Sequence, residues 1–275
     1  MQRVLNLGAG VQSTCLYMMA IDGELRIDYA VFADTGDEPN EVYRHLRFLR
    51  QLSGPEIVEV RASSVSLGQQ LITGMETGRH VSIPAFLAGA ASGVSRRQCT
   101  AEYKIKPIHR YVRERCGLAK GQRVTSPVAT QIMGLSFDEP RRVANVRGAY
   151  EGIAWAVPEF PLFDEFMTRD DCVAWLQKRL PGYTVPRSAC VFCPYKSDAE
   201  WLRLRESDHD GWARAVQIDE AIRDPASACN THCQGTQWLH NSRTPLRDVQ
   251  LNPQPPDRQG RIGFSAMDCE GMCGV

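Results

Sequence analysis

Three cysteines in this 275-residue chain stand in two segments that together look like one split metal site. Cys99 opens the segment Cys-Thr-Ala-Glu-Tyr-Lys-Ile-Lys-Pro, and Cys190 and Cys193 form a Cys-x-x-Cys pair that a proline follows. Three thiolates can hold a [4Fe-4S] cluster and leave one iron open for chemistry. The Cys-x-x-Cys pair alone would also suit half of a zinc site or a redox pair, and thiols that bind no metal are a third possibility.

A second candidate site lies near the start of the chain, where a short apolar strand runs into a glycine turn and then into a helix with an apolar period. The turn, residues 8–13, reads Gly-Ala-Gly-Val-Gln-Ser. Glycines let backbone N–H groups approach an anion, and a helix N-terminus adds a favourable dipole, so this layout suits a phosphate. Such turns are common in α/β folds and are weak evidence alone. The presence of Asp34-Thr-Gly after the second strand is the additional feature that favours a nucleotide. Together the two sites indicate nucleotide-dependent sulfur chemistry.

The elements that must position these residues alternate between strand and helix. Buried strands are predicted over residues 3–7, 29–33, 57–60 and 128–135, and helices over residues 14–21, 41–52 and 105–116. This alternation predicts an α/β fold, a Rossmann-like parallel sheet covered by helices on both faces. Residues 74–95 are rich in Gly, Ala and Ser and have no clear period, which fits either a mobile flap over the site or a long surface loop.

After about Leu162 the pattern becomes mainly helical, with amphipathic stretches over residues 168–180 and 199–222. We therefore expect an α/β nucleotide-binding domain, residues 1–165, and a helical, cysteine-rich C-terminal region, residues 166–275, that completes the cluster site. In that region Cys229 and Cys233, like Cys269 and Cys273, are four residues apart, a spacing that can place two thiols on one helical face. These four cysteines suit a structural zinc site, a persulfide relay or uncommitted thiols.

The composition of the chain excludes few classes of function but bears on its cellular compartment and on the roles of its cysteines. Lys plus Arg and Asp plus Glu both number 32, so net charge gives no argument for a protein that wraps duplex DNA, although a local basic groove stays open. The absence of an 18-residue apolar run and of a signal-peptide core predicts a cytoplasmic protein with no membrane partner. Ten cysteines in such a chain favour metal or catalytic roles over disulfides. Cys15, Cys116 and Cys172 lie in apolar helical contexts and are expected to be packed thiols.

The order of these motifs resembles the phosphoadenosine phosphosulfate reductase-like family of the PP-loop (adenine nucleotide α-hydrolase) superfamily. Residues 8–13 stand in the place of the PP-loop Ser-Gly-Gly-x-Asp-Ser, and Asp34-Thr-Gly resembles the family's Asp-Thr-Gly. The Cys99 segment resembles Cys-Cys-x-x-x-Lys-x-x-Pro, Gly134-Leu-Ser-Phe-Asp-Glu resembles Gly-Leu-Arg-x-Asp-Glu, and Cys190-x-x-Cys resembles the downstream pair of the cluster-bearing members. The resemblance implies a PP-loop ATP pyrophosphatase fold.

The departures from the family pattern carry information. Thr100 replaces the second Cys of the Cys-Cys pair, which leaves three thiolates and an iron free to hold sulfide or a substrate sulfur. Ser136 replaces the Arg of Gly-Leu-Arg, so a guanidinium that could bind sulfate is missing. Asn40 stands where the family has proline, and the reductases' C-terminal Glu-Cys-Gly-Leu-His is absent. These features resemble the sulfur-inserting relatives, the DNA phosphorothioation proteins and the cluster-dependent tRNA thiolation enzymes.

That resemblance implies an ATP-dependent sulfurtransferase that adenylates an oxygen of a nucleic-acid or nucleobase-type acceptor, releases pyrophosphate and inserts sulfur. A cysteine desulfurase is a candidate sulfur donor, and the chain is a candidate homodimer. Cys99, Lys104 and Asp34 are the implied catalytic residues, with Asp34 placing Mg²⁺ or the nucleotide and Lys104 neutralising phosphate or the cluster. The implied ATP-binding residues are Gly8, Ala9, Gly10, Gln12, Ser13, Thr14, Asp34, Thr35, Gly36 and Gly134. The hydroxyls of Ser13 and Thr14 are expected to help hold pyrophosphate.

Two other functions stay open at this point. One is a phosphoadenosine or adenosine phosphosulfate reductase, which would release sulfite. The other is a non-catalytic subunit that binds a nucleotide and a cluster, because Gln12 replaces the acidic residue of the PP-loop.

Overall fold

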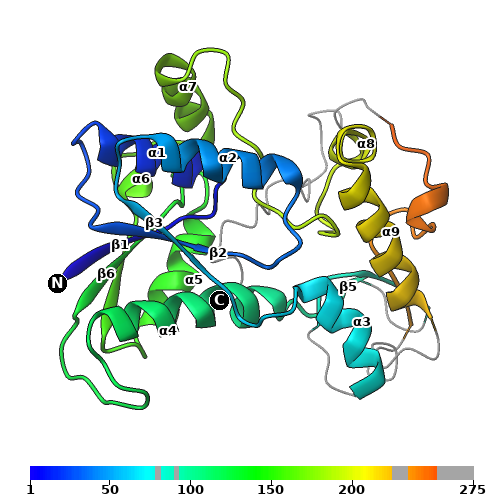
Figure 1. Ribbon diagram of the computed structural model, residues 1–275, viewed down its shortest axis with the longest axis horizontal. Helices are drawn as coiled ribbons and strands as arrows, with labels where there is room; N and C mark the ends of the chain where they lie inside the picture. The colour runs from blue at the N-terminus through cyan, green and yellow to red at the C-terminus, as the bar shows by residue number, and fades with distance from the viewer. Residues whose placement is uncertain (78–81, 90–92, 225–234, 253–275) are drawn as a thin grey trace.

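The centre of the molecule is a parallel sheet of five strands in the order β3-β2-β1-β6-β7. The computed structural model describes residues 1–77, 82–89, 93–224 and 235–252 (Figure 1). The strands are β1 (Gln2–Asn6), β2 (Tyr29–Ala33), β3 (Glu56–Val60), β6 (Ala129–Met133) and β7 (Ala156–Glu159). The predicted α/β fold with a Rossmann-like parallel sheet is therefore confirmed.

Helices cover both faces of this sheet, because the apolar side chains of its strands point alternately to one face and to the other. Leu5 and Phe32 belong to one apolar core with α1 (Val11–Ile21), α2 (Asn40–Gln51) and α7 (Arg169–Arg179). Val4 and Val31 belong to a second core, on the other face, with α4 (Lys106–Arg115) and α5 (Pro140–Tyr150). Figure 1 shows the two helical layers above and below the strands. Successive strand side chains point to opposite faces, so burial on both faces gives the continuous apolar runs seen in the sequence.

A second lobe lies beyond the carboxyl ends of the strands, on the right in Figure 1. It contains α3 (Leu67–Thr77), α8 (Asp198–Ser207), α9 (His209–Arg223), a 3₁₀ turn (Leu246–Asp248) and a small antiparallel sheet of order β5-β4-β8. The strands of that sheet are β4 (Phe86–Ala88), β5 (Gly93–Val94) and β8 (Thr236–Trp238). Short helix α6 (Pro161–Asp164) remains with the large sheet.

The core of this lobe is built around buried Trp201 and a buried carboxylate. Asp219 of α9 is fully buried and accepts hydrogen bonds from the backbone N–H groups of Leu239 and Leu246, at 3.1 and 2.9 Å. Arg223, one turn further along α9, pairs with the same carboxylate at 3.0 Å. Because a buried carboxylate needs such partners, Asp219 fixes the chain after β8 against α9.

Two expectations about this lobe were wrong. Residues 74–95 are not an irregular surface loop where the structure describes them, since α3 extends to Thr77 and β4 and β5 pair with each other; the alternative of a mobile flap stays a prediction. The predicted helix over residues 199–222 is two helices, because Asp208 leaves helical geometry and caps α9 by accepting from the Gly211 N–H at 3.0 Å. A Cβ at Gly211 would lie 2.8 Å from the Asp208 carboxyl carbon, so glycine permits this close cap.

The packing crosses the expected domain boundary at residue 165. Helix α7, which follows it, packs on α1, and α3, which precedes it, packs on α9. The division into residues 1–165 and 166–275 stays a prediction that these contacts do not follow. Within the described residues, no helix has both the length and the apolar character that crossing a membrane requires.

Candidate functional site

The predicted nucleotide-binding segments meet at the carboxyl edge of the parallel sheet. Residues 8–10 follow β1, residues 34–36 follow β2 and Gly134 follows β6. The helix after β1 covers one face of the sheet and the helix after β6 covers the other, so the chain diverges between these neighbouring strands. Open α/β sheets bind ligands at such a switch point.

The loop after β1 leads directly into the N-terminus of α1. Gly10 is extended, with φ −99° and ψ −176°, and its carbonyl accepts from the Thr14 N–H at 2.9 Å and the Ser13 hydroxyl at 3.3 Å. No side chain caps α1, so the first N–H groups of the helix remain available to an anion. Ala9 has φ 62°, in the left-handed region that disfavours a side chain and where the PP-loop pattern has glycine.

Thr14 does not face this loop. Its hydroxyl lies 2.8 Å from Nε2 of His45 in α2, and Nδ1 of that imidazole lies 2.8 Å from the Tyr183 hydroxyl. Thr14 and His45 are buried. The geometry therefore gives the Thr14 hydroxyl a partner between α1 and α2, and it does not support the expectation that this hydroxyl holds pyrophosphate.

The buried His45 predicts a pH dependence of stability. Burial lowers the pKa of His45 to about 4, below the value of about 6.5 of an exposed imidazole. Between these values the unfolded chain binds a proton that the folded protein excludes, so stability falls as the pH falls from about 6.5 toward 4. Linkage gives a loss of about 2 kcal/mol for this residue between pH 7.5 and 5.

Urea denaturation of the wild type and of His45→Gln at both pH values measures this contribution. The free energy of unfolding of the variant should fall by about 2 kcal/mol less than that of the wild type over this range. His209→Gln, at an exposed position, is the matched control and should keep the wild-type pH dependence. Identical pH dependence in wild type and His45→Gln would contradict the assignment.

The two departures in the nucleotide motifs meet in one cluster. The Gln12 amide nitrogen donates to the Ser136 hydroxyl at 3.2 Å and to a carboxylate oxygen of Glu139 at 2.9 Å. Arg142 pairs with the same carboxylate. An acid at position 12 would repel Glu139, whereas the amide of Gln12 bridges the loops after β1 and β6. The amide oxygen of Gln12 is buried and has no hydrogen-bond partner in the described structure, so a donor on a ligand would satisfy it.

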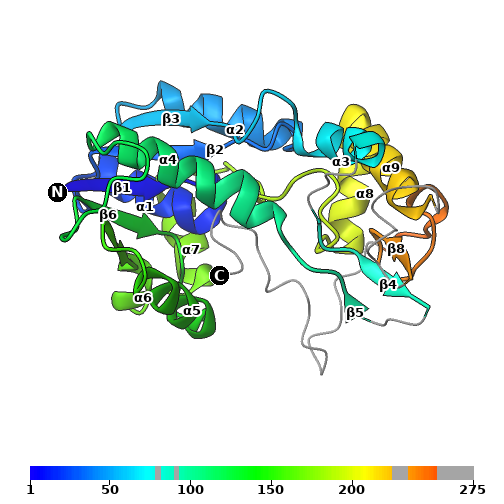
Figure 2. The ribbon, with the colours of Figure 1, turned by 90° about the horizontal axis from the view of Figure 1, so that it is seen from below.

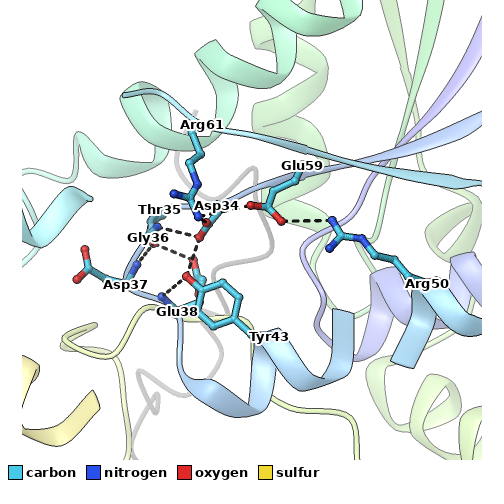
Figure 3. A network of polar contacts seen from close by, with 9 residues as sticks. All are labelled: Asp34, Thr35, Gly36, Asp37, Glu38, Tyr43, Arg50, Glu59 and Arg61. Atoms are coloured by element: carbon cyan, nitrogen blue, oxygen red, sulfur yellow. Dashed lines mark hydrogen bonds and ion pairs between the residues drawn. The ribbon is translucent and has the colours of Figure 1, made fainter. Parts of the chain in front are cut away.

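Asp34 is the centre of a polar network at the end of β2 (Figure 3). Its buried carboxylate accepts from the Gly36 N–H and the Tyr43 hydroxyl, both at 2.8 Å, and pairs with Arg61. Burial and the nearby Asp34 carboxylate raise the pKa of the Tyr43 phenol, so it remains a donor. These contacts order the loop. They leave direct binding of Mg²⁺ by Asp34 dependent on movement of Arg61, whose side chain is half exposed.

Gly36 has a conformational reason to be glycine. Its φ is 77°, and a Cβ there would lie 2.7 Å from Cβ of Ser66, at the start of α3. The neighbouring Thr35 carbonyl accepts from the Leu67 N–H at 2.8 Å. The candidate nucleotide loop after β2, residues 34–38, therefore touches the first turn of α3 directly.

The same loop continues into contacts with α3, α8 and α9. Asp37 points away from the Asp34 network (Figure 3) and accepts from the Gly68 N–H at 2.6 Å and from Arg214 at 3.0 Å. The Asn40 N–H and side-chain amide each donate to Asp208 at 2.8 Å. Proline at position 40 could not donate the first of these bonds. This departure from the family pattern thus connects the loop to the cap of α9.

The three predicted metal-binding cysteines come together in one pocket at this junction. Cys99, Cys190 and Cys193 line it with Thr35, Lys104 and Thr100, among others. The Cys190 carbonyl accepts from the Cys193 N–H at 3.0 Å, which closes a turn and brings the second thiol back toward the first. The Val191 N–H donates to the Asp37 carbonyl at 2.8 Å and fixes this turn to the nucleotide loop. Position 100, where the family pattern has another cysteine, lines the same pocket.

The donor set fits soft-metal chemistry, since thiolates are the ligands of zinc and iron–sulfur clusters. In the described residues, no three His, Cys, Asp or Glu side chains are arranged to hold one metal ion. The pocket encloses about 20 Å³, about the space of one water molecule, so a cluster requires the thiols to move apart. A hydrogen bond to Cys193 and burial raise the pKa of the Cys190 thiol well above its usual value. Metal binding would therefore have to remove a proton.

Two cationic side chains border the thiols. Lys104 is buried and pairs with Glu38 at 3.7 Å, and Arg97 donates to the Thr100 hydroxyl at 2.9 Å. Lys104 therefore lines the cysteine pocket, and its role in neutralising phosphate or a cluster stays a prediction. Its pairing partner, Glu38, belongs to the nucleotide loop, so Lys104 connects the two predicted sites.

The other cysteines divide into two groups. Cys15 and Cys172 are fully buried in the core between α1 and α7, and Cys116 donates to the Gln2 side chain at 3.4 Å, as expected for packed thiols. The C-terminal cysteines Cys229, Cys233, Cys269 and Cys273 lie outside the described residues. The suggested zinc site there stays a prediction.

Sequence reasoning missed the side chains that hold the site together, namely Glu38, Arg61, Asp208 and Arg214. Arg61 directly follows β3 and Glu38 follows the Asp34 motif, so their position after two neighbouring parallel strands was a usable signal. Asp208 and Arg214 lie in the second lobe and carry no motif. No protein-family model matches the chain, and neither the curated proteins nor the solved structures contain a match. Its function must therefore be argued from its residues.

Proposed function

We propose that the protein is an ATP-dependent sulfurtransferase of the PP-loop type, related to the phosphoadenosine phosphosulfate reductase-like family. Its acceptor is a nucleic acid or nucleobase, and Cys99, Cys190 and Cys193 hold a [4Fe-4S] cluster. One observation carries the proposal: the three cysteines line one pocket with Thr35 of the candidate nucleotide loop and Lys104. The residues for sulfur chemistry and a residue of the candidate nucleotide loop would then line the same pocket.

The first part of the proposed reaction is adenylation. The N–H groups of the loop at residues 8–13 and the N-terminus of α1 bind the ATP phosphates, and the Asp34 network holds the neighbouring loop in shape. An acceptor oxygen attacks the α-phosphorus of ATP, and pyrophosphate leaves. Lys104, which lines the cysteine pocket, lowers the electrostatic repulsion between the anionic acceptor and the nucleotide.

The second part is replacement of oxygen by sulfur. A sulfide nucleophile attacks the activated centre and AMP leaves with the former acceptor oxygen, so no net oxidant or reductant is required. A cluster with three protein thiolates supplies an iron with an open position for sulfur. Cys99, Cys190 and Cys193 would hold it, and Arg97 and Lys104 offset its negative charge. We further propose a cytoplasmic location, a cysteine desulfurase as the source of sulfide and a homodimeric assembly.

An anaerobic assay with ATP, Mg²⁺ and sulfide tests this function. Pyrophosphate and AMP should form in equal amounts with an oxygen-to-sulfur mass change in candidate nucleic acids or nucleobases, detected by mass spectrometry. Cys99→Ser should lower product formation at least about 100-fold, equivalent to about 2.7 kcal/mol, while Cys116→Ser should retain it. Sulfite release from a sulfonucleotide without ATP would establish a reductase instead. ATP binding without pyrophosphate release from any acceptor would favour the non-catalytic subunit.

A further inference from the structure

A large cavity lined by the described residues is separate from the cysteine pocket. It has a volume of about 700 Å³ and lies among α3, the residues after β3 and the start of α4. Its polar lining comes from Ser63, Gln70, Thr73, Glu102, Tyr103, Lys106 and Arg110. None of the residues predicted from the sequence to bind ATP or metal lines this cavity, so it needs its own explanation.

One helix, which begins with a π-helical segment, contributes lining residues to both cavities. Residues Ala101–Ile105 form a π-helix that runs directly into α4, and Pro107, which lacks an N–H, sits at the start of α4. Thr100 and Lys104 line the cysteine pocket, whereas Tyr103 and Lys106 line the large cavity. The large cavity therefore lies on a neighbouring face of the helix that begins at Cys99.

Helix α3 also contributes lining residues to both cavities. Leu67 lines the cysteine pocket, and Gln70 and Thr73 line the large cavity. The Tyr103 hydroxyl donates to the Gln70 side chain and joins α3 to the π-helix at the lining of the large cavity. A ligand in the large cavity would consequently be held next to the cysteine pocket by the two elements that also build that pocket.

The charges in the cavity suit an anionic ligand. Arg110 is exposed and donates to the Arg61 carbonyl at 2.9 Å, and among the described residues no carboxylate forms an ion pair with it. Glu102 also lines the cavity, but it pairs with Lys106 one turn later in the same helix, so the guanidinium of Arg110 is the uncompensated charge of the lining. A planar guanidinium of this kind binds a phosphate with two parallel hydrogen bonds.

The remaining lining suits the rest of a nucleotide. Hydroxyls of Ser63 and Thr73 can contact a sugar or a base edge, and Val65 and Pro107 offer apolar surface. The Gln70 amide is already bonded to Ser63 and Tyr103. The volume lies within the range of about 300–1,000 Å³ of pockets that enclose small organic ligands. Phosphate alone would leave most of this space unused.

We infer that this cavity binds one nucleotide unit of the sulfur acceptor, with its phosphate on Arg110. Calling that nucleotide the acceptor rests on the proposed function, whereas the binding itself does not. The ligand chemistry, a phosphorylated nucleoside, is the same for a free nucleotide and for one unit of a single strand. The experiment below separates these two sources.

Calorimetric titration with nucleoside 5′-monophosphates, inorganic phosphate and a single-stranded oligonucleotide tests the inference. A non-hydrolysable ATP analogue is present throughout to fill the ATP site. The dissociation constant of the best monophosphate should rise at least about 10-fold in Arg110→Ala, the size expected for loss of a charged hydrogen bond. Arg26→Ala, which removes an exposed arginine at the opposite end of the sheet, should bind like wild type. Binding of the ATP analogue should be the same in all three proteins.

Several outcomes decide the matter. An unchanged dissociation constant in Arg110→Ala overturns the inference, and so does inorganic phosphate that binds as tightly as any nucleotide. Tighter binding of the oligonucleotide than of the monophosphates identifies a strand as the source, and the reverse identifies a free nucleotide; both support the cavity assignment. Because no turnover is measured, failure of sulfur insertion would leave this result standing. Sulfur insertion that proceeds equally well in Arg110→Ala would refute the cavity and not the proposed function.

Discussion

Anaerobically purified protein is expected to be brown and to contain about four irons and four sulfides per chain, and the variants Cys99→Ala, Cys190→Ala and Cys193→Ala to lose most of both. The reason is the arrangement of the three thiols in one pocket beside Thr100, whose hydroxyl is already bonded to Arg97 and cannot act as a thiolate ligand. With three ligands, loss of any one leaves two thiolates, too few to retain the cluster. Iron and sulfide analysis with a visible spectrum measures the effect.

Two control variants make this result specific. Cys116→Ala removes a partly buried thiol far from the pocket, and Cys15→Ala removes a fully buried one, so both should keep the iron. Colourless wild-type protein with zinc bound at the same three cysteines would disprove the cluster.

How much the sequence could predict depends on how local each signal is. Strand β2 was predicted to the residue because Tyr29–Ala33 is a continuous apolar run, buried on both faces. Strands β4 and β8 have three residues each, too few for any period to appear. The break between α8 and α9 depends on Asp208, whose cap is reinforced by Asn40 from the distant nucleotide loop. Such a break follows from tertiary contacts and not from amphipathic pattern.

The candidate site shows the same limit. The cysteines, Asp34 and Lys104 were found because each stands in a recognisable spacing. Their partners were not, because Arg61 reaches Asp34 only after β2 and β3 pair. The role of Gln12 was also hidden, since an amide in place of an acid suggested lost function, whereas the structure shows it bridging to Glu139 of another loop. Motif positions were thus predictable, and the side chains that connect one motif to another required the fold.

Replacing Gly10 with leucine should abolish ATP binding. Gly10 has φ −99°, which any residue can adopt, so the variant introduces no backbone strain. A bulky side chain at the N-terminus of α1 would prevent the phosphates from approaching the backbone N–H groups. Loss of two charged hydrogen bonds, each worth about 1.5–3 kcal/mol, raises the dissociation constant at least about 100-fold.

Equilibrium binding of a fluorescent ATP analogue measures that change, with Gly148→Leu as the matched control. Gly148 lies in α5, and a Cβ there would meet no atom within 4 Å, so the same substitution should leave ATP affinity unchanged. Circular dichroism of both variants checks that they fold. Ala9→Gly adds a test of the loop itself, because glycine adopts the φ of 62° at position 9 without strain and should preserve binding. A folded Gly10→Leu protein that binds ATP with wild-type affinity would place the ATP site elsewhere. The proposed reaction would then lose the contact between the ATP site and the cysteine pocket on which it depends.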